Sequence, residues 1–459
     1  MRCASGYMAR SALLAVLCSM ALTCRAQDEP AADSTNEVAA PPAVVSTNTL
    51  LPPRPSSVAL KPPDVLTVKR MVGEVEKSGI TLFTRVFSID TQAGINELFQ
   101  RCRAQDKEIL QNGRNSVSAR IEEGYASPGF QRRFGITVAS SPYFDLVAPQ
   151  RMVYVSRGVQ KRQGTSNIVA QVMATADKTF KETVSTFLMA PFIDWRAVRG
   201  RIFIVTDAQI WSTFVASQVK PQPVQTVYTD AARREFIVYA GPEAFEYLDQ
   251  AVAYAVASAV IDEYARAISG KPQARLPLFL VAGLAGELSG LEVVQTRMGP
   301  LQLPQYTVNY RTYRVSQPKR GFMAPLNTKR LRSLDELAGT AEYPAKSDEL
   351  YYFLRQSRAV AEALSSNAPL AMVNLARALA GGSEFQKEVG LSYMEMQRDV
   401  LAKPVVAKPA AKPSESGAPK YPDYERFAQY MNTVFARLTE EHLGEQLKQR
   451  KPTAKPAAK

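Results

Sequence analysis

Two apolar stretches lie close together in the second half of the chain, AVAYAVASAVI at residues 251–261 and LPLFLVAGLAGELSG at residues 276–290. The first is apolar on nearly every side of a helix and is too short to cross a bilayer, so it belongs in the interior of a folded domain. Gly270 is a suitable stop for the first helix, and Gly290 for the second. These stretches predict a pair of buried helices at the centre of the fold.

Strands and helices alternate on the N-terminal side of this helix pair. Short runs rich in β-branched and aromatic residues predict strands, and a stripe of apolar residues between 165 and 187 recurs at helical spacing. The predicted strands are 134–139, 143–148, 152–156, 201–207, 226–229 and 235–240. Strands interleaved with helices predict an α+β or α/β core.

Changes in composition divide the remainder of the chain. Within the N-terminal part we expect a strand at 81–89, a helix at 95–110 and a turn-rich stretch at 125–129. The expected organisation is a signal peptide at 1–26, a disordered Pro/Ala/Ser-rich linker at 27–64, a small N-terminal α+β subdomain at 65–132, a core at 133–290, a helical C-terminal subdomain at 291–401, an Ala-Lys-Pro linker at 402–420, an isolated amphipathic helix at 421–449 and a disordered basic tail at 450–459.

The first residues have the pattern of a secretory signal. Arg2 and Arg10 precede an apolar stretch, and Cys24-Arg25-Ala26 offers a small-x-small cleavage site before Gln27. The apolar stretch is shorter than a membrane span, so we expect no transmembrane span and an exported protein of the periplasm or cell envelope. A lipid-anchored form, modified at Cys24, is the alternative.

Charge and cysteine content narrow the partners and the chemistry. The chain has 56 Lys and Arg against 43 Asp and Glu, but the excess is spread out and many lysines lie in the linkers, so we expect no nucleic acid partner. After cleavage only Cys102 would remain. It is interpreted as a buried thiol, with an intermolecular bridge or a reactive site as alternatives.

From Ser141 to Leu401 the sequence resembles the peptidase-MA-like proteins of the gluzincin class of zinc metallopeptidases. The segments that carry the resemblance are SPYFDLV (141–147), RIFIVTD (201–207), the helix at 251–261, LPLFLVAGLA (276–285), YYFLRQSRAVAEAL (351–364) and ARALAGGSEFQKEVGLSYMEMQRDV (376–400). The resemblance implies a zincin fold, with a mixed sheet over an active-helix pair and a helical subdomain after it.

The zinc-binding positions of that family are all substituted here. In an HExxH motif the two histidines share one helix face and bind Zn²⁺, while the glutamate activates a water. Those positions correspond to Tyr254, Ala255 and Ser258, and the glutamate that supplies the third ligand corresponds to Ala282. The one histidine of the chain, His442, lies far along the sequence, so we expect no metal, no cofactor and no catalytic residues.

Polar residues remain around the vacated positions, and they support two hypotheses. Tyr254, Ser258, Asp262, Glu263 and Glu287 could line a binding cleft in a non-catalytic module that holds an extended peptide or an envelope protein. Alternatively, the carboxylates could act as a general acid and base, making the chain a hydrolase without a metal.

The sequence alone leaves open what covers the C-terminal helix and whether the chain has a purely structural role. The apolar stripe of the helix at 421–449 must be buried, either on the body of the protein or on a partner. A purely structural envelope protein, held through its basic linkers, is a third possibility for the whole chain.

Overall fold

The computed structural model describes residues 50–51, 60–68, 70, 91–156, 159–241, 244, 248–291, 293–295, 308–310, 331–367, 369–400 and 421–435. The predicted signal peptide, the strand at 81–89, the Ala-Lys-Pro linker, His442 and the basic tail lie outside the described residues.

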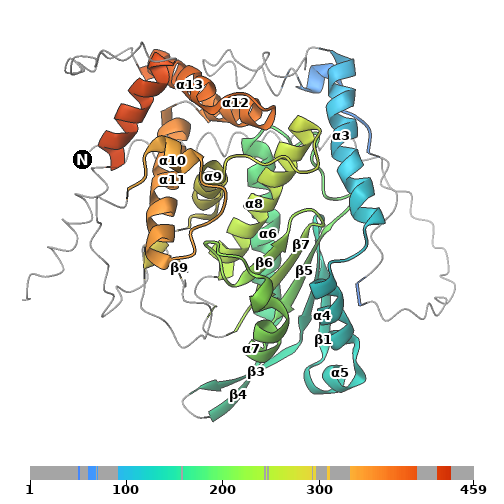
Figure 1. Cartoon of the computed structure of the whole chain (residues 1–459). Coiled ribbons are helices and arrows are strands. Elements are labelled where there is room, and N and C mark those ends of the chain that lie inside the picture. Colours follow the sequence, from blue (N-terminus) through green and yellow to red (C-terminus); the bar gives the residue numbers. More distant parts are fainter. Residues whose placement is uncertain are drawn as a thin grey trace, which may run out of the picture.

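A mixed five-stranded sheet forms the centre of the structure (Figure 1). The described strands are β1 (Ile136–Ser140), β2 (Phe144–Pro149), β3 (Arg151–Ser156), β4 (Val159–Gly164), β5 (Gly200–Val205), β6 (Val227–Asp230), β7 (Glu235–Tyr239), β8 (Val293–Gln295) and β9 (Val308–Tyr310). The order in the sheet is β1-β2-β5-β7-β6. Strands β2, β5 and β7 are parallel, and the edge strands β1 and β6 are antiparallel to their neighbours. The predicted α+β class with a mixed sheet is therefore confirmed.

Helices cover both faces of this sheet. The described helices are α3 (Gln92–Gln111), α4 (Ser116–Ala126), α5 (Pro128–Phe134), α6 (Ser166–Thr186), α7 (Ala208–Ile210), η2 (Trp211–Val215), η3 (Ala216–Gln218), α8 (Leu248–Ser269), α9 (Leu278–Ser289), α10 (Leu334–Ala338), α11 (Ser347–Asn367), α12 (Pro369–Ala380) and α13 (Phe385–Val400). In Figure 1, α3 stands on one side of α8, and α9 to α13 lie on the other.

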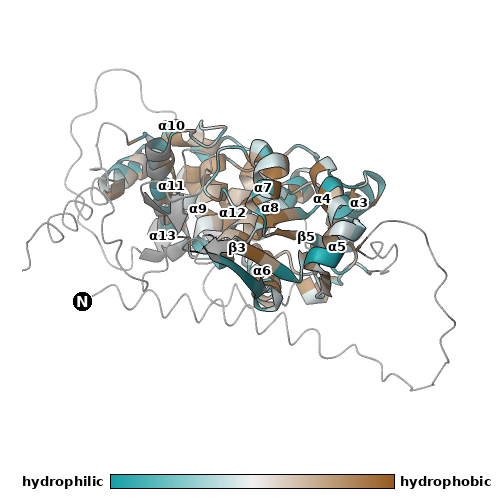
Figure 2. Ribbon diagram, turned by 90° about the horizontal axis from the view of Figure 1, so that it is seen from below, coloured by the Kyte–Doolittle hydropathy of each residue, from teal (hydrophilic) through white to brown (hydrophobic). Residues whose placement is uncertain are grey.

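Side chains alternate between the two faces of the sheet, as they must in extended strands. Leu146, Ile204 and Phe236 pack into the larger apolar core with α6 and α8. Val205 and Ile237 pack into a smaller core with α4 and η2 on the opposite face. Because both faces are covered, β5 is apolar along most of its length, and Figure 2 shows it as one of the most hydrophobic elements.

One expected turn is a pair of short helices. The stretch 125–129, predicted to be rich in turns, contains the end of α4 and the start of α5. The Asn115 side chain accepts a hydrogen bond from Val117 N and caps α4, while Ser127 caps α5 with Pro128 in its first turn. The Ser-Pro-Gly sequence therefore marks a break between two helices.

The expected N-terminal subdomain has no core of its own among the described residues. Phe99 and Cys102 of α3 are buried in the larger core beside α8, whereas Ile121 of α4 is buried in the smaller one. Leu51, which lies in the predicted disordered linker, is also buried in the smaller core. Both regions are thus parts of the central body.

The helix pair identified from the sequence packs closely. Helices α8 and α9 contact each other, and α9 also packs along α11. At Gly283 an added Cβ atom would lie 2.4 Å from the carbonyl oxygen of Ser357 and 2.8 Å from Cβ of Ala361. Only glycine fits at this position without moving α11 away from α9.

The C-terminal amphipathic helix is not isolated. Over the described range 422–435 its apolar residues Tyr424, Phe427 and Met431 are buried in the larger core. The Tyr424 hydroxyl donates to Asp335 at the start of α10, and its ring packs edge-on against Phe385 of α13. The stripe is therefore buried within the chain, and a partner is not required to cover it.

Two smaller features bear on the earlier expectations. Among the described residues, no helix combines the length and the hydropathy needed to cross a bilayer.

Cys102 is a buried free thiol, and burial raises its pKa well above the ordinary value, which opposes formation of the reactive thiolate.

The packing of the C-terminal helix predicts a stability difference between two neighbouring substitutions. Phe427→Ala removes a fully buried ring and should lower the free energy of unfolding by about 3–5 kcal/mol. Asn432→Ala, on the exposed side of the same helix, should change it by less than about 0.5 kcal/mol. Urea unfolding of the whole chain measures both, and equal effects would show that the helix does not pack on the body in solution.

Candidate functional site

The face of α8 at which the resemblance implies a metal is filled by side chains. Tyr254 is buried, and its hydroxyl lies 2.6 Å from the hydroxyl of Tyr343, in the segment before α11. Burial raises the pKa of Tyr343, so this phenol stays protonated and can donate in the hydrogen bond. The Tyr254–Tyr343 pair joins α8 to the C-terminal part of the chain.

The other positions of the zinc site that the resemblance implies offer at most one hydroxyl group. Ser258 and Ala282 stand at the two remaining ligand positions, and Ala255 stands where the water-activating glutamate would be. Ala255 and Ala282 are both buried, and a methyl group cannot bind a cation. Catalytic zinc needs three protein ligands drawn from histidine, cysteine and carboxylate side chains. In the part of the chain that the structure describes, no three such side chains are grouped closely enough to hold a metal. The residues present at this position therefore do not fit a zinc ion.

Asp262 follows Tyr254 and Ser258 on the same side of α8. Its pKa is raised above the ordinary value of 3.8, chiefly because burial disfavours the ionised carboxylate, while Arg266 and Arg275 act in the opposite direction. The charge of Asp262 in turn contributes to the raised pKa of Tyr343. Asp262 and the tyrosine pair therefore form one electrostatically linked group.

Ser258 and Glu287 have different surroundings. The Ser258 hydroxyl is buried and has no hydrogen-bond partner among the residues the structure describes. Glu287 of α9 accepts a hydrogen bond of 3.1 Å from the Ser365 hydroxyl of α11. Glu287 thus links α9 to α11, away from the Tyr254–Tyr343 pair.

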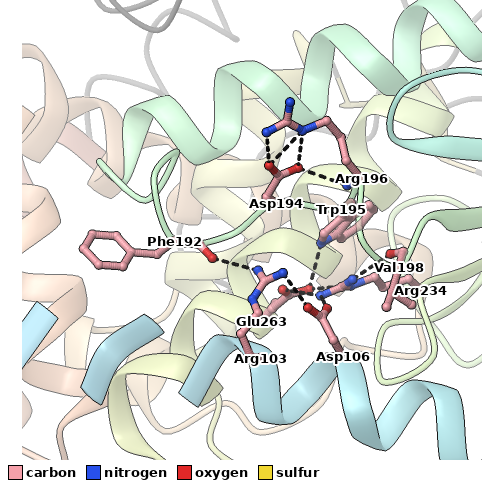
Figure 3. A network of polar contacts seen from close by, with 9 residues as sticks. All are labelled: Arg103, Asp106, Phe192, Asp194, Trp195, Arg196, Val198, Arg234 and Glu263. Carbon is pink, nitrogen blue, oxygen red and sulfur yellow. Dashed lines mark hydrogen bonds and ion pairs between the residues drawn. The ribbon is translucent and has the colours of Figure 1, made fainter. Parts of the chain in front are cut away.

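Glu263 lies on the opposite side of α8 and has a structural partner. Nine residues after Tyr254, it is turned by half a revolution around the helix. Its carboxylate accepts hydrogen bonds of 2.9 Å and 2.6 Å from Nε and Nη2 of Arg234, and one of 2.9 Å from the indole of Trp195 (Figure 3). A carboxylate held by an arginine and an indole in the interior is already satisfied as an acceptor.

The Arg234–Glu263 pair extends to α3. Nη2 of Arg234 lies 2.8 Å from a carboxylate oxygen of Asp106, which also forms an ion pair of 2.7 Å with Arg103. The guanidinium of Arg234 stacks over the Trp195 ring, and its Nη1 donates to the carbonyl of Val198. Figure 3 shows these groups converging on Arg234 from α3, α8 and the loop before β5. The cluster holds together α3, α8, the loop before β5 and the turn between β6 and β7.

The carboxylates proposed as acid and base are therefore dispersed. Glu263 is bound to Arg234, Glu287 faces α11, and Asp262 interacts electrostatically with Tyr343. Of the predicted site residues, Tyr254 contacts Tyr343, and Tyr343 was missed because it lies in a segment without periodicity. The sequence does contain a signal for the partner of Glu263, because an acidic residue within an apolar helix is rarely buried without a charged partner.

Comparison with known proteins adds no relative. No family model matches the chain, and no curated protein or solved structure shows significant similarity to it.

The buried cluster predicts that Glu263 is a structural residue. Glu263→Gln leaves the fully buried Arg234 with Asp106 as its remaining carboxylate and should lower the free energy of unfolding by about 3 kcal/mol. Glu287→Gln can still accept from Ser365 and should cost less than about 1 kcal/mol. Urea unfolding of both variants measures the difference, and an unchanged stability of Glu263→Gln would contradict the structural role.

The raised pKa of Asp262 predicts a pH-dependent effect. The unfolded chain releases this proton near 3.8, before the folded chain does, so ionisation of Asp262 costs stability as the pH rises through its folded pKa. Asp262→Asn should therefore stabilise the protein more at pH 7 than at pH 3.5, as measured by urea unfolding. A variant that is less stable than the wild type at pH 7 would mean that the arginines hold the carboxylate ionised.

Proposed function

We propose that the chain is an exported, non-catalytic member of the peptidase-MA-like class, acting as a peptide-binding or scaffolding module of the cell envelope. The observation that carries the proposal is the hydrogen bond between the buried Tyr254 and the half-buried Tyr343, at the position where the resemblance implies a metal site. Such a pair stabilises the framework where an active relative would keep an open metal position.

The arrangement of the core supports a zincin-type fold. The helices α8 and α9, which carry the vacated positions, contact each other, and α8 packs on the edge strand β6. That strand is antiparallel to β7 and forms one border of the mixed sheet. A mixed sheet over a helix pair is the framework that the resemblance implies.

The open side of β6 offers a place for an extended peptide. Tyr239 N donates to the carbonyl of Thr226, so in the antiparallel register the backbone groups of Val227 and Thr229 point away from β7. The side chain of Gln222 donates to the Val227 carbonyl at 2.8 Å and occupies part of this edge. A peptide added as a strand would pair with Thr229 and displace Gln222.

The alternative is a hydrolase that uses carboxylates without a metal. It would have to rely on Asp262, because Glu263 is held by Arg234 and Glu287 by Ser365. A pair of carboxylates facing one substrate is the usual requirement for such chemistry. The separate surroundings of these residues favour the non-catalytic module.

Peptide binding at β6 can be tested with a pair of proline substitutions. Decapeptides selected by phage display against the intact mature chain should bind it, and Thr229→Pro should weaken binding at least tenfold by removing the outward N–H of the edge. Val138→Pro removes the equivalent group of the other edge strand, β1, and should leave binding unchanged. Isothermal titration measures the affinities.

Two outcomes would contradict the proposal. Failure to select any peptide, or equal binding by Thr229→Pro and the wild type, would exclude the β6 edge as the binding site. Stoichiometric zinc in the purified mature chain would contradict its non-catalytic assignment, because the positions identified here lack metal ligands.

A further inference from the structure

Residues 50–51 of the chain itself are bound at the smaller core, on the face of the sheet that α4 covers. The backbone N–H groups of Leu50 and Leu51 donate to one carboxylate oxygen of Glu122 in α4, at 2.6 Å and 3.0 Å. The segment lies more than 70 residues before Glu122 in the sequence, so this is a long-range contact. Hydrogen bonds from backbone N–H groups to a carboxylate are charge-assisted and are stronger than those between neutral groups.

The side chain of Leu51 completes the contact. It is buried in the smaller core, which also contains Ile121 of α4 and Trp211 of η2. Leu50 packs on the edge of the same core and is half-buried. The site therefore recognises two features at once, a pair of successive backbone donors and one leucine side chain.

The acceptor is held in place by a charged group of the body. Glu122 is almost fully buried in the middle of α4, and Arg114, just before this helix, forms an ion pair with its second oxygen. The indole N–H of Trp211 is buried in this core without a hydrogen-bond partner among the described residues. A buried carboxylate fixed by an arginine is a preorganised acceptor for backbone N–H groups.

The sequence of the segment suits this recognition. Pro52 follows Leu51 and restricts it to extended backbone conformations, and neither Pro52 nor Pro53 can donate a hydrogen bond. The donors of the segment therefore end at Leu51, at the point where its side chain enters the core. Among the described residues, the segment contributes one buried leucine, one half-buried leucine and two hydrogen bonds, which is a small contact compared with a stable interface.

We propose that Glu122, Arg114 and the surrounding apolar core form an acceptor site for a Leu-Leu-Pro peptide, filled by residues 50–51 of the same chain and able to exchange them for such a peptide. We refer to it as the Leu51 site. It is distinct from the β6 edge and does not depend on the function proposed for that edge. Peptides that carry this motif, including the same segment of another copy, are its expected ligands.

The test uses the intact chain with the internal segment displaced. Leu51→Asp places a second carboxylate beside Glu122 and should release the segment without changing the body. A fluorescein-labelled peptide STNTLLPPRP, which repeats residues 46–55, should bind this variant saturably in an anisotropy titration. It should bind the wild type at least tenfold more weakly, because the tethered segment competes at high effective concentration.

A chemical control isolates the backbone contact. The same peptide with an N-methyl group on its second leucine cannot donate the corresponding N–H and should bind Leu51→Asp at least tenfold more weakly. Thr229→Pro, combined with Leu51→Asp, should leave binding unchanged, which separates this site from the β6 edge. The intrinsic fluorescence of Trp211 should change as the peptide binds.

The outcomes are decisive in each direction. Equal binding of the peptide by the wild type and Leu51→Asp, or equal binding of the N-methylated peptide, would overturn the proposal. If circular dichroism shows that Leu51→Asp is unfolded, Leu51→Ala replaces it, and it should bind the peptide more tightly than the wild type does. Absence of binding to a folded Leu51→Ala would likewise refute the exchange.

Discussion

The ion pair between Arg234 and Glu263 connects most parts of the structure. Glu263 fixes the C-terminal half of α8, Arg234 lies in the turn just before β7, and Asp106 and Trp195 bring α3 and the loop before β5 to the same point. Arg234 also has a left-handed backbone conformation, with φ of 53°, which is unfavourable for a residue other than glycine. The buried hydrogen bonds hold the residue in a conformation that the turn alone would not favour.

This anchor separates the two faces of α8 by role. One face carries Glu263 and holds the helix against the sheet and α3, whereas the other carries Tyr254 and Asp262 towards Tyr343. A helix that is fixed on one side can change the residues on its other side without loss of position. The Arg234–Glu263 pair would therefore keep α8 in position after the replacement of metal ligands that we propose for the opposite face of the helix.

The sequence predicted the regular elements better than the contacts between them. Each predicted strand within the described residues is a strand, because alternating apolar residues and turn signals are local properties. The buried helix pair was likewise visible in two apolar runs. The Tyr254–Tyr343 pair and the attachment of Leu51 were not predicted, since each joins residues that are distant in sequence and one partner lies in a segment without periodicity. The helix at 422–435 was correctly expected to be amphipathic, but its burial on α10 and α13 depends on surfaces that no local pattern describes.

The position of that last helix has a consequence for biosynthesis. A ribosome makes the chain from the N-terminus, so the residues that cover α10 and α13 emerge after the rest of the body is complete. Until then the apolar surface that receives Tyr424, Phe427 and Met431 stays open to solvent. A chain that folds before this helix is added would therefore expose an apolar surface that favours aggregation and suits binding by chaperones.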